Sequence, residues 1–479
     1  MGNLINRMMR KTNPAVYSKK DSHMKRTLRI RDFLALGIGT IVSTAIFTLP
    51  GIVAAKHAGP AVSISFIIAA VIAGFSALDY AEMASAMPFA GSAFSWISVL
   101  FGEVWGWIAG WALLAEYFIA GAFISSGLST NLQGLLSSIG FNLPKFMASS
   151  FGTKGGIFNL IAALAVLIVF SVLHHSTKGT AKIENVLVIA KIIVIALFII
   201  VGITAVHAQN YVPFVPAHHV NPDGSNFGGI SGILAGVSMI FISYLGFDTL
   251  AANSAEAKDP KRTMPTAIIG SLVIASAMFI MVSLVLVGMF PYQKYAGNAQ
   301  PVGWALRASH HVLTANVIEG VATICMFSAL IGAMMAGSRL IYSFGRDGML
   351  PKWLGHITKR GLPENALLLV TISSIVVGSV LPFTFITQLV SAGTLIAFMF
   401  VALAMFTLRH REGKDINEPD FKVPFYPVTP ILAFIGTLIV FWNLDSAAKI
   451  YTVGWFVLGM IVYFCYGIRH EEHAKQAKK

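Results

Sequence analysis

The chain has 479 residues, of which 56% are hydrophobic and only 11% are charged. Soluble domains carry about 25% charged residues, so this composition excludes a soluble protein and indicates an integral membrane protein. The formal net charge is +13, but the basic residues lie in short loops and tails, which is typical of membrane topology and contact with anionic lipid rather than of nucleic-acid binding. Two cysteines, Cys325 and Cys465, allow no disulfide framework.

Twelve apolar segments approach the length of about 20 residues that a membrane-spanning helix requires. We expect these spans at 32–55, 60–85, 102–126, 157–174, 184–206, 228–253, 266–290, 316–342, 364–381, 384–408, 427–442 and 449–468. An even number places both termini on the same side of the membrane. Most lysines and arginines fall in the tails and in alternate loops, which predicts that the tails 1–31 and 469–479 are cytoplasmic.

Small residues interrupt the first and the sixth of these spans. The interruptions lie within 37–47 and 243–249. An unwound stretch in the hydrocarbon leaves backbone groups unsatisfied, so it is tolerated only where it lines a cavity or binds something. Two such interruptions at matching places point to a transporter's binding site. We therefore expect an all-α membrane fold with two halves, 32–206 and 228–408, followed by 427–468.

The candidate binding residues lie at these interruptions. Backbone N–H groups near Ser43, Thr44 and Ala45 are suited to bind a carboxylate at the start of a half-helix, although small residues also serve as helix–helix contacts. Asp248 is suited to meet a substrate ammonium or to hold the unwound backbone; a helix cap without ligand contact is the alternative. Tyr244 is expected to be an aromatic wall or lid, or a packed core residue.

Other ionisable residues lie inside predicted spans. Lys191 is the single charge in the apolar run 186–198, and a lysine at a helix centre costs about 2.5–3.5 kcal/mol on insertion. We expect it to contact carbonyls or a carboxylate, either exchanging a proton, replacing a bound cation or forming a structural ion pair. Glu116 faces the site or steadies a neighbouring helix. Asp79 and Glu82 are expected to pair with basic residues near the inner surface.

The sequence contains no recognisable motif for catalysis or cofactor binding. It has no histidine or cysteine spacing typical of a metal site, no phosphate-binding loop, no dinucleotide fingerprint and no nucleophile elbow. We therefore expect no metal, no cofactor, no enzymatic activity and no direct coupling to ATP.

A series of short motifs extends along nearly the whole chain in a fixed order. They are 37–51, His57-Ala-Gly59-Pro60, Tyr80-Ala-Glu82, Pro88-Phe-Ala-Gly91-Ser92-Ala-Phe94, 110–117, Tyr244-Leu-Gly-Phe-Asp248, 256–265 and Arg346-Asp347-Gly348-Met-Leu-Pro351. In this order and spacing the chain resembles the amino acid–polyamine–organocation (APC) superfamily. Within that superfamily it resembles the bacterial permeases that are similar to cationic amino acid transporters.

The resemblance implies a LeuT-like fold, an inverted repeat of five plus five helices with helices 1 and 6 unwound, that works by alternating access. It places the substrate carboxylate at Ser43, Thr44 and Ala45, and the substrate amino group at carbonyls near Ile242, Ser243 and Leu245. Lys191 matches a lysine of the fifth span that is thought to replace a sodium ion, which favours proton coupling or exchange over sodium symport.

Two positions depart from the family pattern. The family usually has glycines where this chain has Ser43 and Ala45, so the side chains here narrow the space for the carboxylate. Many relatives have an aromatic gate where this chain has Ile242. Phe241 or Tyr244 would then act as the gate.

These observations favour secondary active transport of L-amino acids across the cytoplasmic membrane, coupled to protons or to a counter-substrate. An exchanger of amino acids or polyamines is the alternative within transport. A sensor built on a transporter scaffold usually has a long soluble tail, and a channel fits poorly with a buried Lys191 and asymmetric interruptions. The sequence leaves open which amino acid is carried, the stoichiometry, and whether the protein is a monomer or a dimer.

Overall fold

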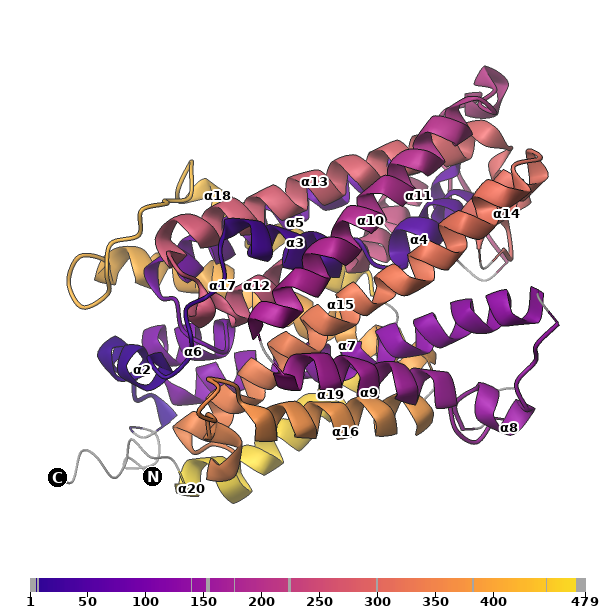
Figure 1. Ribbon diagram of the computed structural model, residues 1–479. Helices are drawn as coiled ribbons and strands as arrows, with labels where there is room; N and C mark the ends of the chain where they lie inside the picture. Colours follow the sequence, from indigo (N-terminus) through magenta and orange to yellow (C-terminus); the bar gives the residue numbers. More distant parts are fainter. Residues whose placement is uncertain are drawn as a thin grey trace.

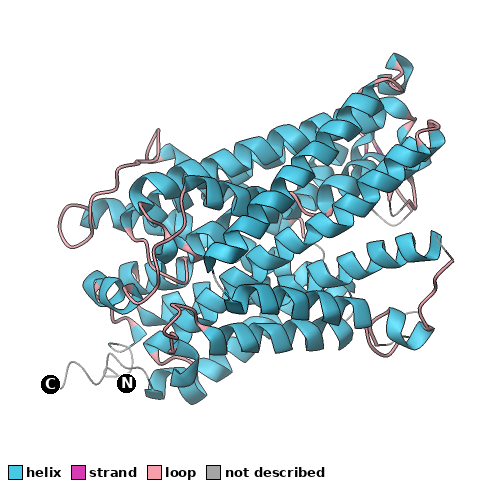
Figure 2. Cartoon of the chain, viewed as in Figure 1, coloured by secondary structure: helices cyan, strands magenta, loops and turns pink. Residues whose placement is uncertain are grey.

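The structure is a computed structural model that describes residues 6, 8–138, 140–151, 156–175, 177–222, 225–298, 300–380, 383–444 and 446–470. Almost all of the described chain is helical, and Figure 2 shows the long helices side by side along one direction. Strands β1 (His219–Val220) and β2 (Asn226–Phe227) form a short antiparallel pair, with His219 opposite Phe227.

The helices succeed one another along the chain with short connections. In order they are α2 (Pro14–Asp21), α3 (Ile30–Ile41), α4 (Ala45–Val53), η1 (Ala54–Ala58), η2 (Gly59–Ala61), α5 (Val62–Ala86), α6 (Ala93–Leu100), α7 (Glu103–Ser138), α8 (Lys145–Ala148), α9 (Leu160–His175), α10 (Thr177–Ile203), η3 (Ala208–Tyr211), α11 (Gly229–Ile240), η4 (Phe241–Tyr244), α12 (Phe247–Ala252), η5 (Ser254–Glu256), α13 (Pro260–Met289), η6 (Tyr292–Tyr295), α14 (Pro301–Ala308), α15 (Val312–Asp347), η7 (Lys352–Gly355), α16 (Glu364–Val380), α17 (Phe383–Arg411), α18 (Val428–Trp442), α19 (Ser446–Val462), η8 (Tyr463–Gly467) and α20 (Ile468–His470).

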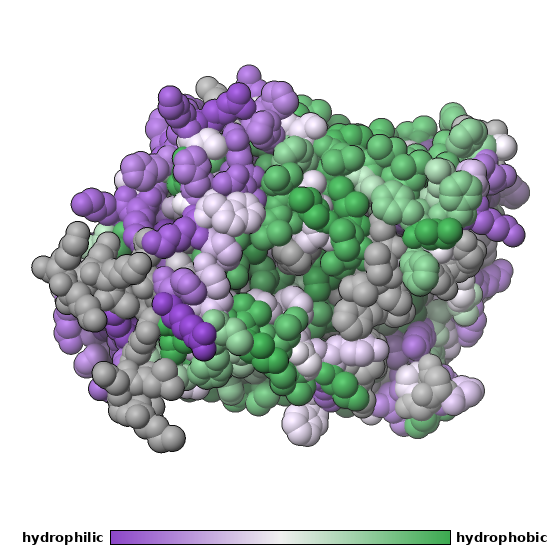
Figure 3. All heavy atoms as spheres, turned by 90° about the horizontal axis from the view of Figure 1, so that it is seen from below, coloured by the Kyte–Doolittle hydropathy of each residue, from purple (hydrophilic) through white to green (hydrophobic). Residues whose placement is uncertain are grey.

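The outer surface of the bundle is apolar where a membrane would surround it. Eight helical runs of the described chain are long and apolar enough to cross a membrane, and α9, α16 and α18 are shorter apolar helices. Large aliphatic side chains such as Val186 and Ile200 are exposed, and Figure 3 shows a broad apolar zone between polar ends. Exposed apolar side chains on this scale are stable in lipid and not in water, so the protein is a multi-pass membrane protein.

Both predicted interruptions are present as breaks between helices. Helix α3 ends at Ile41 and α4 begins at Ala45, leaving 42–44 outside both helices. The second break follows η4, a turn of 3₁₀-helix: Leu245 is extended, and Gly246 has a φ of 125° before α12 begins at Phe247. A φ in that region is strained for any residue with a Cβ, so a glycine is required where this helix is broken.

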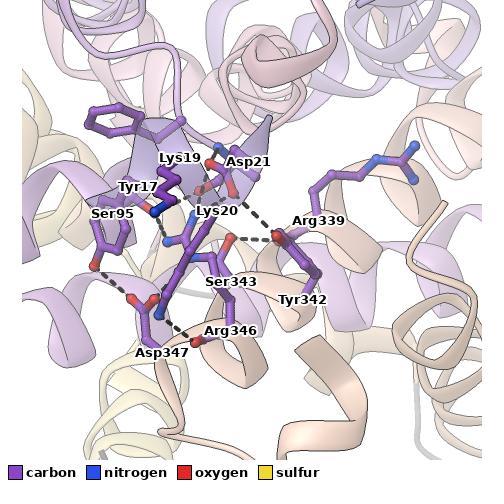
Figure 4. A network of polar contacts seen from close by, with 12 residues as sticks. Tyr17, Lys19, Lys20, Asp21, Ser95, Arg339, Tyr342, Ser343, Arg346 and Asp347 are labelled. Carbon is purple, nitrogen blue, oxygen red and sulfur yellow. Dashed lines mark hydrogen bonds and ion pairs between the residues drawn. The ribbon is translucent and has the colours of Figure 1, made fainter. Parts of the chain in front are cut away.

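A buried arginine holds together the end of the bundle at which α2 lies, as Figure 4 shows. The Arg346 guanidinium of α15 donates to both carboxylate oxygens of Asp21 at 2.8 and 2.9 Å, to Asp347 at 2.9 Å and to Ser95 at 3.0 Å. The Tyr17 ring lies 4.0 Å from the guanidinium carbon. These bonds attach α2 and α6 to α15, which lies far from both of them in the sequence.

Tyr17 completes this network from the other side. Its hydroxyl donates to Asp347 at 2.6 Å. Burial and the neighbouring Asp347 carboxylate raise the pKa of Tyr17 well above its ordinary value. The hydroxyl therefore remains a hydrogen-bond donor over the whole physiological pH range.

We expect Arg346→Met to lower the free energy of unfolding by about 3–5 kcal/mol, because it leaves the carboxylates of Asp21 and Asp347 buried without their cation. Thermal melting of the purified protein in detergent measures the loss. Arg31→Met is the matched control, since the Arg31 side chain is 76% exposed and should shift the melting temperature little. Equal melting curves for the two variants would contradict this account.

Candidate functional site

The two helix breaks lie against each other in the middle of the bundle. The Thr40 hydroxyl, at the end of α3, lies 3.2 Å from the Gly246 carbonyl and also within hydrogen-bond distance of the Leu36 and Gly37 carbonyls of its own helix, at 2.9 and 3.0 Å. A Cβ built on Gly246 would lie 3.1 Å from the backbone nitrogen of Ile41. Residues separated by about two hundred positions in the sequence therefore form one region of irregular backbone.

The first break presents small side chains beside the start of a helix. Ser43, Thr44 and Ala45 are partly exposed, and the first N–H groups of α4 have no partner within that helix. Because these N–H groups also lie at the positive end of the α4 dipole, they favour an anionic group. This end of α4 is suited to a carboxylate.

The second break presents carbonyl groups and aliphatic side chains. Ile242 and Leu245 are partly exposed, whereas Ser243 is buried and its hydroxyl donates to the Ile240 carbonyl at 2.6 Å. The Ile242 carbonyl accepts a hydrogen bond from the Leu245 N–H at 3.3 Å. Beyond it the helix stops, which leaves the following carbonyls without an intrahelical donor. An ammonium group is the natural ligand for such carbonyls, and Ile242 and Leu245 would contact an apolar side chain.

A small cavity adjoins the first break. It has a volume of about 40 Å³ and lies next to Thr44; its other walls include Phe47, Asn131, Gln300 and Glu319. A cavity of this size holds a few water molecules.

Asp248 holds the unwound backbone of the second break. One of its carboxylate oxygens accepts a hydrogen bond from the Gly246 N–H at 3.1 Å, and the other accepts one from the Tyr117 hydroxyl. Its side chain is fully buried. The structure thus places Asp248 beneath the break, where its carboxylate holds the backbone of Gly246, the residue before α12.

Glu116 lies close to Asp248 and joins α7 to α17. Its carboxylate accepts a hydrogen bond from the Thr394 hydroxyl at 2.6 Å, and it is near enough to Asp248 for the two carboxyl groups to interact. Glu116 is also buried. Both carboxyls therefore belong to the packing beneath the break rather than to its accessible surface.

The two candidate gate residues are packed into the core. The Tyr244 hydroxyl donates to the Phe66 carbonyl of α5 at 3.0 Å, and its ring packs against Phe66 and Phe279. Phe241 is 2% exposed. A gating movement of either ring would require it to leave these contacts.

Lys191 connects α10 to α3 directly before the first break. Its ammonium donates to the Gly39 carbonyl at 2.9 Å, and the side chain is buried. This is the carbonyl contact that we expected for a lysine inside a span. The state of Lys191 is thereby linked to the position of α3.

Glu184 is a buried residue that sequence reasoning missed. It lies on α10 seven residues before Lys191 and accepts a hydrogen bond from the Ser328 hydroxyl of α15 at 2.5 Å. A Cβ on Gly39 would collide with the Glu184 carboxylate and the Ser328 hydroxyl. The seven-residue spacing, which places two residues on one helix face, is the signal that would have revealed it.

Of the two acidic residues near the C-terminal end of α5, only one pairs as expected. Glu82 accepts hydrogen bonds from the Arg409 guanidinium at 2.9 Å and from the Val423 N–H at 2.5 Å. The expectation is wrong for Asp79, whose carboxylate oxygens have no hydrogen-bond partner among the described residues. The reason is geometric, since Arg409 reaches Glu82 at the end of the helix, one turn beyond Asp79.

We expect Gly246→Ala to destabilise the protein by about 1–3 kcal/mol, because alanine is strained at a φ of 125° and its Cβ would press on Thr40 at 3.0 Å. Gly74→Ala is the control. Gly74 lies within α5 with no atom within 4 Å of a Cβ placed there, and alanine favours a helix. Thermal melting should show a lower melting temperature for Gly246→Ala but not for Gly74→Ala. An unchanged melting temperature in Gly246→Ala would contradict the claim that this position requires glycine.

Comparison with known proteins identifies the family. The model of a family described as amino acid permease matches residues 30–466. The chain is 56% identical to the branched-chain amino acid permease BcaP of Lactococcus lactis subsp. cremoris (strain MG1363), covering 97% of this chain and 99% of that protein. It is 34% identical to the methylthioribose transporter of Bacillus subtilis (strain 168), over 94% and 95% of the two chains.

A plant relative lies further away. The chain is 30% identical to the vacuolar cationic amino acid transporter 4 of Arabidopsis thaliana, over 86% of this chain and 68% of that protein. The relatives are named as permeases and transporters, not as enzymes. The broken helices, the apolar surface and these similarities agree, and the chain belongs to the amino acid permease family of the APC superfamily and is an amino acid transporter.

Proposed function

We propose that this protein is a secondary active transporter of branched-chain L-amino acids, with protons as the coupling ion. The observation that carries the proposal is the contact of the two breaks at Thr40 and Gly246. It brings the start of α4 and the end of η4 to one place. A zwitterion needs both, since one end suits its carboxylate and the other its ammonium.

The proposed binding mode assigns one function to each break. The substrate carboxylate binds N–H groups near Ser43, Thr44 and Ala45, and the ammonium binds carbonyls of Ile242, Ser243 and Leu245. The side chain of the substrate contacts Ile242 and Leu245, the two partly exposed aliphatic residues of the second break. An aliphatic substrate is also what the name of the 56% identical relative indicates.

We further propose twelve membrane passes arranged as a LeuT-like inverted repeat, 32–206 and 228–408, followed by 427–468. The run Ile30–Ala86 accounts for two passes, because it contains the broken helix α3–α4 and then α5. The seven other long runs account for one pass each, and the shorter helices α9, α16 and α18 add three. Each half begins with a broken helix. The third long helix of each half, α7 or α15, has 36 residues.

The orientation follows from charge. Helices α2 and α20 lie at the same end of the bundle in Figure 1, which is also the end that carries Arg346. Basic residues concentrate on the side that faces the cytoplasm. We propose that both termini are cytoplasmic and that the protein resides in the cell membrane.

We assign proton coupling to Lys191. In its charged form the ammonium binds the Gly39 carbonyl and holds α3 against α10; in its neutral form this bond is weaker and α3 is freer to move. Loading and release of a proton would thus be tied to movement at the first break. An exchanger that needs a counter-substrate is the second candidate, since the same geometry allows it.

We expect Lys191→Ala to abolish uptake driven by a proton gradient, while a melting curve shows a folded protein. Lys182→Ala is the matched control, because Lys182 is an exposed lysine of the same helix and should leave uptake unchanged. The measurement is initial uptake into proteoliposomes with and without an inward proton gradient. Full gradient dependence in Lys191→Ala would rule out the assignment.

We expect unlabelled leucine, isoleucine and valine to compete with radiolabelled leucine uptake into proteoliposomes at least tenfold better than lysine or arginine. The reason is that each methylene contact in an apolar site contributes about 1–3 kcal/mol to binding. A cationic side chain would instead lose its hydration against the apolar Ile242 and Leu245, which weakens binding. If a proton gradient drives accumulation of leucine in vesicles that contain no internal substrate, the protein is a symporter. Uptake into preloaded vesicles alone indicates exchange, and preferred competition by lysine would overturn the branched-chain assignment.

A further inference from the structure

The inner part of α5 carries a polar face inside the bundle. Ser76, Asp79 and Glu82 follow one another at three-residue spacing, so they lie on one side of the helix. Helix α5 packs against α17 and α18, and Ile72 on the same side would touch a Cβ placed on Gly436 of α18. The polar face is therefore enclosed by protein.

Glu82 closes this face toward the inner surface. Its hydrogen bonds to the Arg409 guanidinium and the Val423 N–H join α5 to the end of α17 and to the loop before α18. Its side chain is fully buried. Glu82 thus has the cationic partner that a buried carboxylate requires.

Asp79, one turn deeper, has no such partner. It is 1% exposed, and both carboxylate oxygens lack a hydrogen-bond donor within the described part of the chain. The Ser76 hydroxyl, one turn further on, is 2% exposed and equally without a partner there. Two adjacent buried polar groups on this face of α5 are therefore without a hydrogen-bond partner among the described residues.

The charges around Asp79 do not compensate it. The charged group that acts on it most directly is Glu82, which has the same sign. From α17 come Arg409, which is bound to Glu82, and Arg411, which pairs with Asp415. Glu412, directly after α17, pairs with Lys422 and Arg409, and Arg262 of α13 is exposed. On α13 the ammonium of Lys261 points away to Asp420.

The remaining neighbouring helices add no cation. The described residues of α11 and α18 contain no charged side chain, and α12 contributes only Asp248, which is occupied by Tyr117 and Gly246. An isolated carboxylate in an apolar interior is so unfavourable that the group takes up a proton instead. A neutral carboxylic acid needs far fewer polar or charged partners in an apolar interior than a carboxylate ion does.

We propose that Asp79, with Ser76 beside it, is a proton-binding site at the inner end of α5, separate from Lys191. In this conformation the carboxyl group carries the proton. It lies one turn above the Glu82–Arg409–Val423 contacts, which shield it from the inner surface. When these contacts separate, water reaches Asp79 and the carboxyl group ionises.

The role of this proton in transport rests on the proton coupling proposed above. The presence of a protonated carboxyl group at Asp79 does not depend on that coupling. Infrared spectroscopy of the full-length protein separates the two questions. Protein labelled with ¹³C at the aspartate side-chain carboxyl should show the C=O stretching band of a carboxylic acid at neutral pH. In Asp79→Asn the band should lose the area of one carboxyl group.

Asp415→Asn is the matched control. Asp415 is an aspartate outside the bundle that pairs with Arg411, and this pairing lowers its pKa, so it is ionised and adds nothing to the band. If Asp79→Asn does not fold, Asp79→Ser replaces it. Identical acid bands in the wild type and the Asp79 variant would overturn the proposal.

Uptake measured on the same variants then tests the role in transport. Asp79→Asn should reduce the ratio of uptake with and without a proton gradient at least tenfold and leave exchange in preloaded vesicles intact. A wild type that shows the acid band but no gradient-driven uptake would refute proton coupling and retain the site. A variant that loses the band and keeps the full gradient ratio would refute the role of Asp79 in coupling.

Discussion

The structure depends on one constraint, which is that a backbone polar group in the hydrocarbon of a membrane needs a partner. Two helices are broken there, and Gly246 shows how the need is met. Its carbonyl accepts hydrogen bonds from the hydroxyl and the N–H of Thr249, and its N–H donates to Asp248. The irregular backbone is therefore supported from within the bundle, and the start of α4 and the end of η4 are the places where we propose that the substrate binds.

The same constraint governs the buried charges. Lys191 binds the Gly39 carbonyl next to the first break, and Arg346 binds α2 to the C-terminal end of α15. A change in the charge of such a group alters the strength of its contact. Asp79 differs because it has no partner in the described structure, and a proton is the simplest means of removing its charge.

Relatives whose names give different substrates are similar to this protein over most of its length. The branched-chain permease, the methylthioribose transporter and the cationic amino acid transporter are each similar over most of this chain. In the binding mode that we propose, backbone groups at the breaks bind the carboxylate and the ammonium of an amino acid, and side chains select among amino acids. Ile242 and Leu245 are the aliphatic residues that this proposal assigns to the side chain of the substrate.

The sequence by itself determined the membrane class and the positions of both helix breaks, because apolar length and small residues are local signals. For Lys191 it left open whether the contact is a carbonyl or a carboxylate, and the structure shows the Gly39 carbonyl. Only the tertiary structure decided which groups meet. It placed Asp248 beneath the break, packed Tyr244 against α5, revealed Glu184 beside Ser328, and gave Arg409 to Glu82 rather than Asp79. Such pairings join residues of different helices, and a sequence does not state how helices are rotated toward one another.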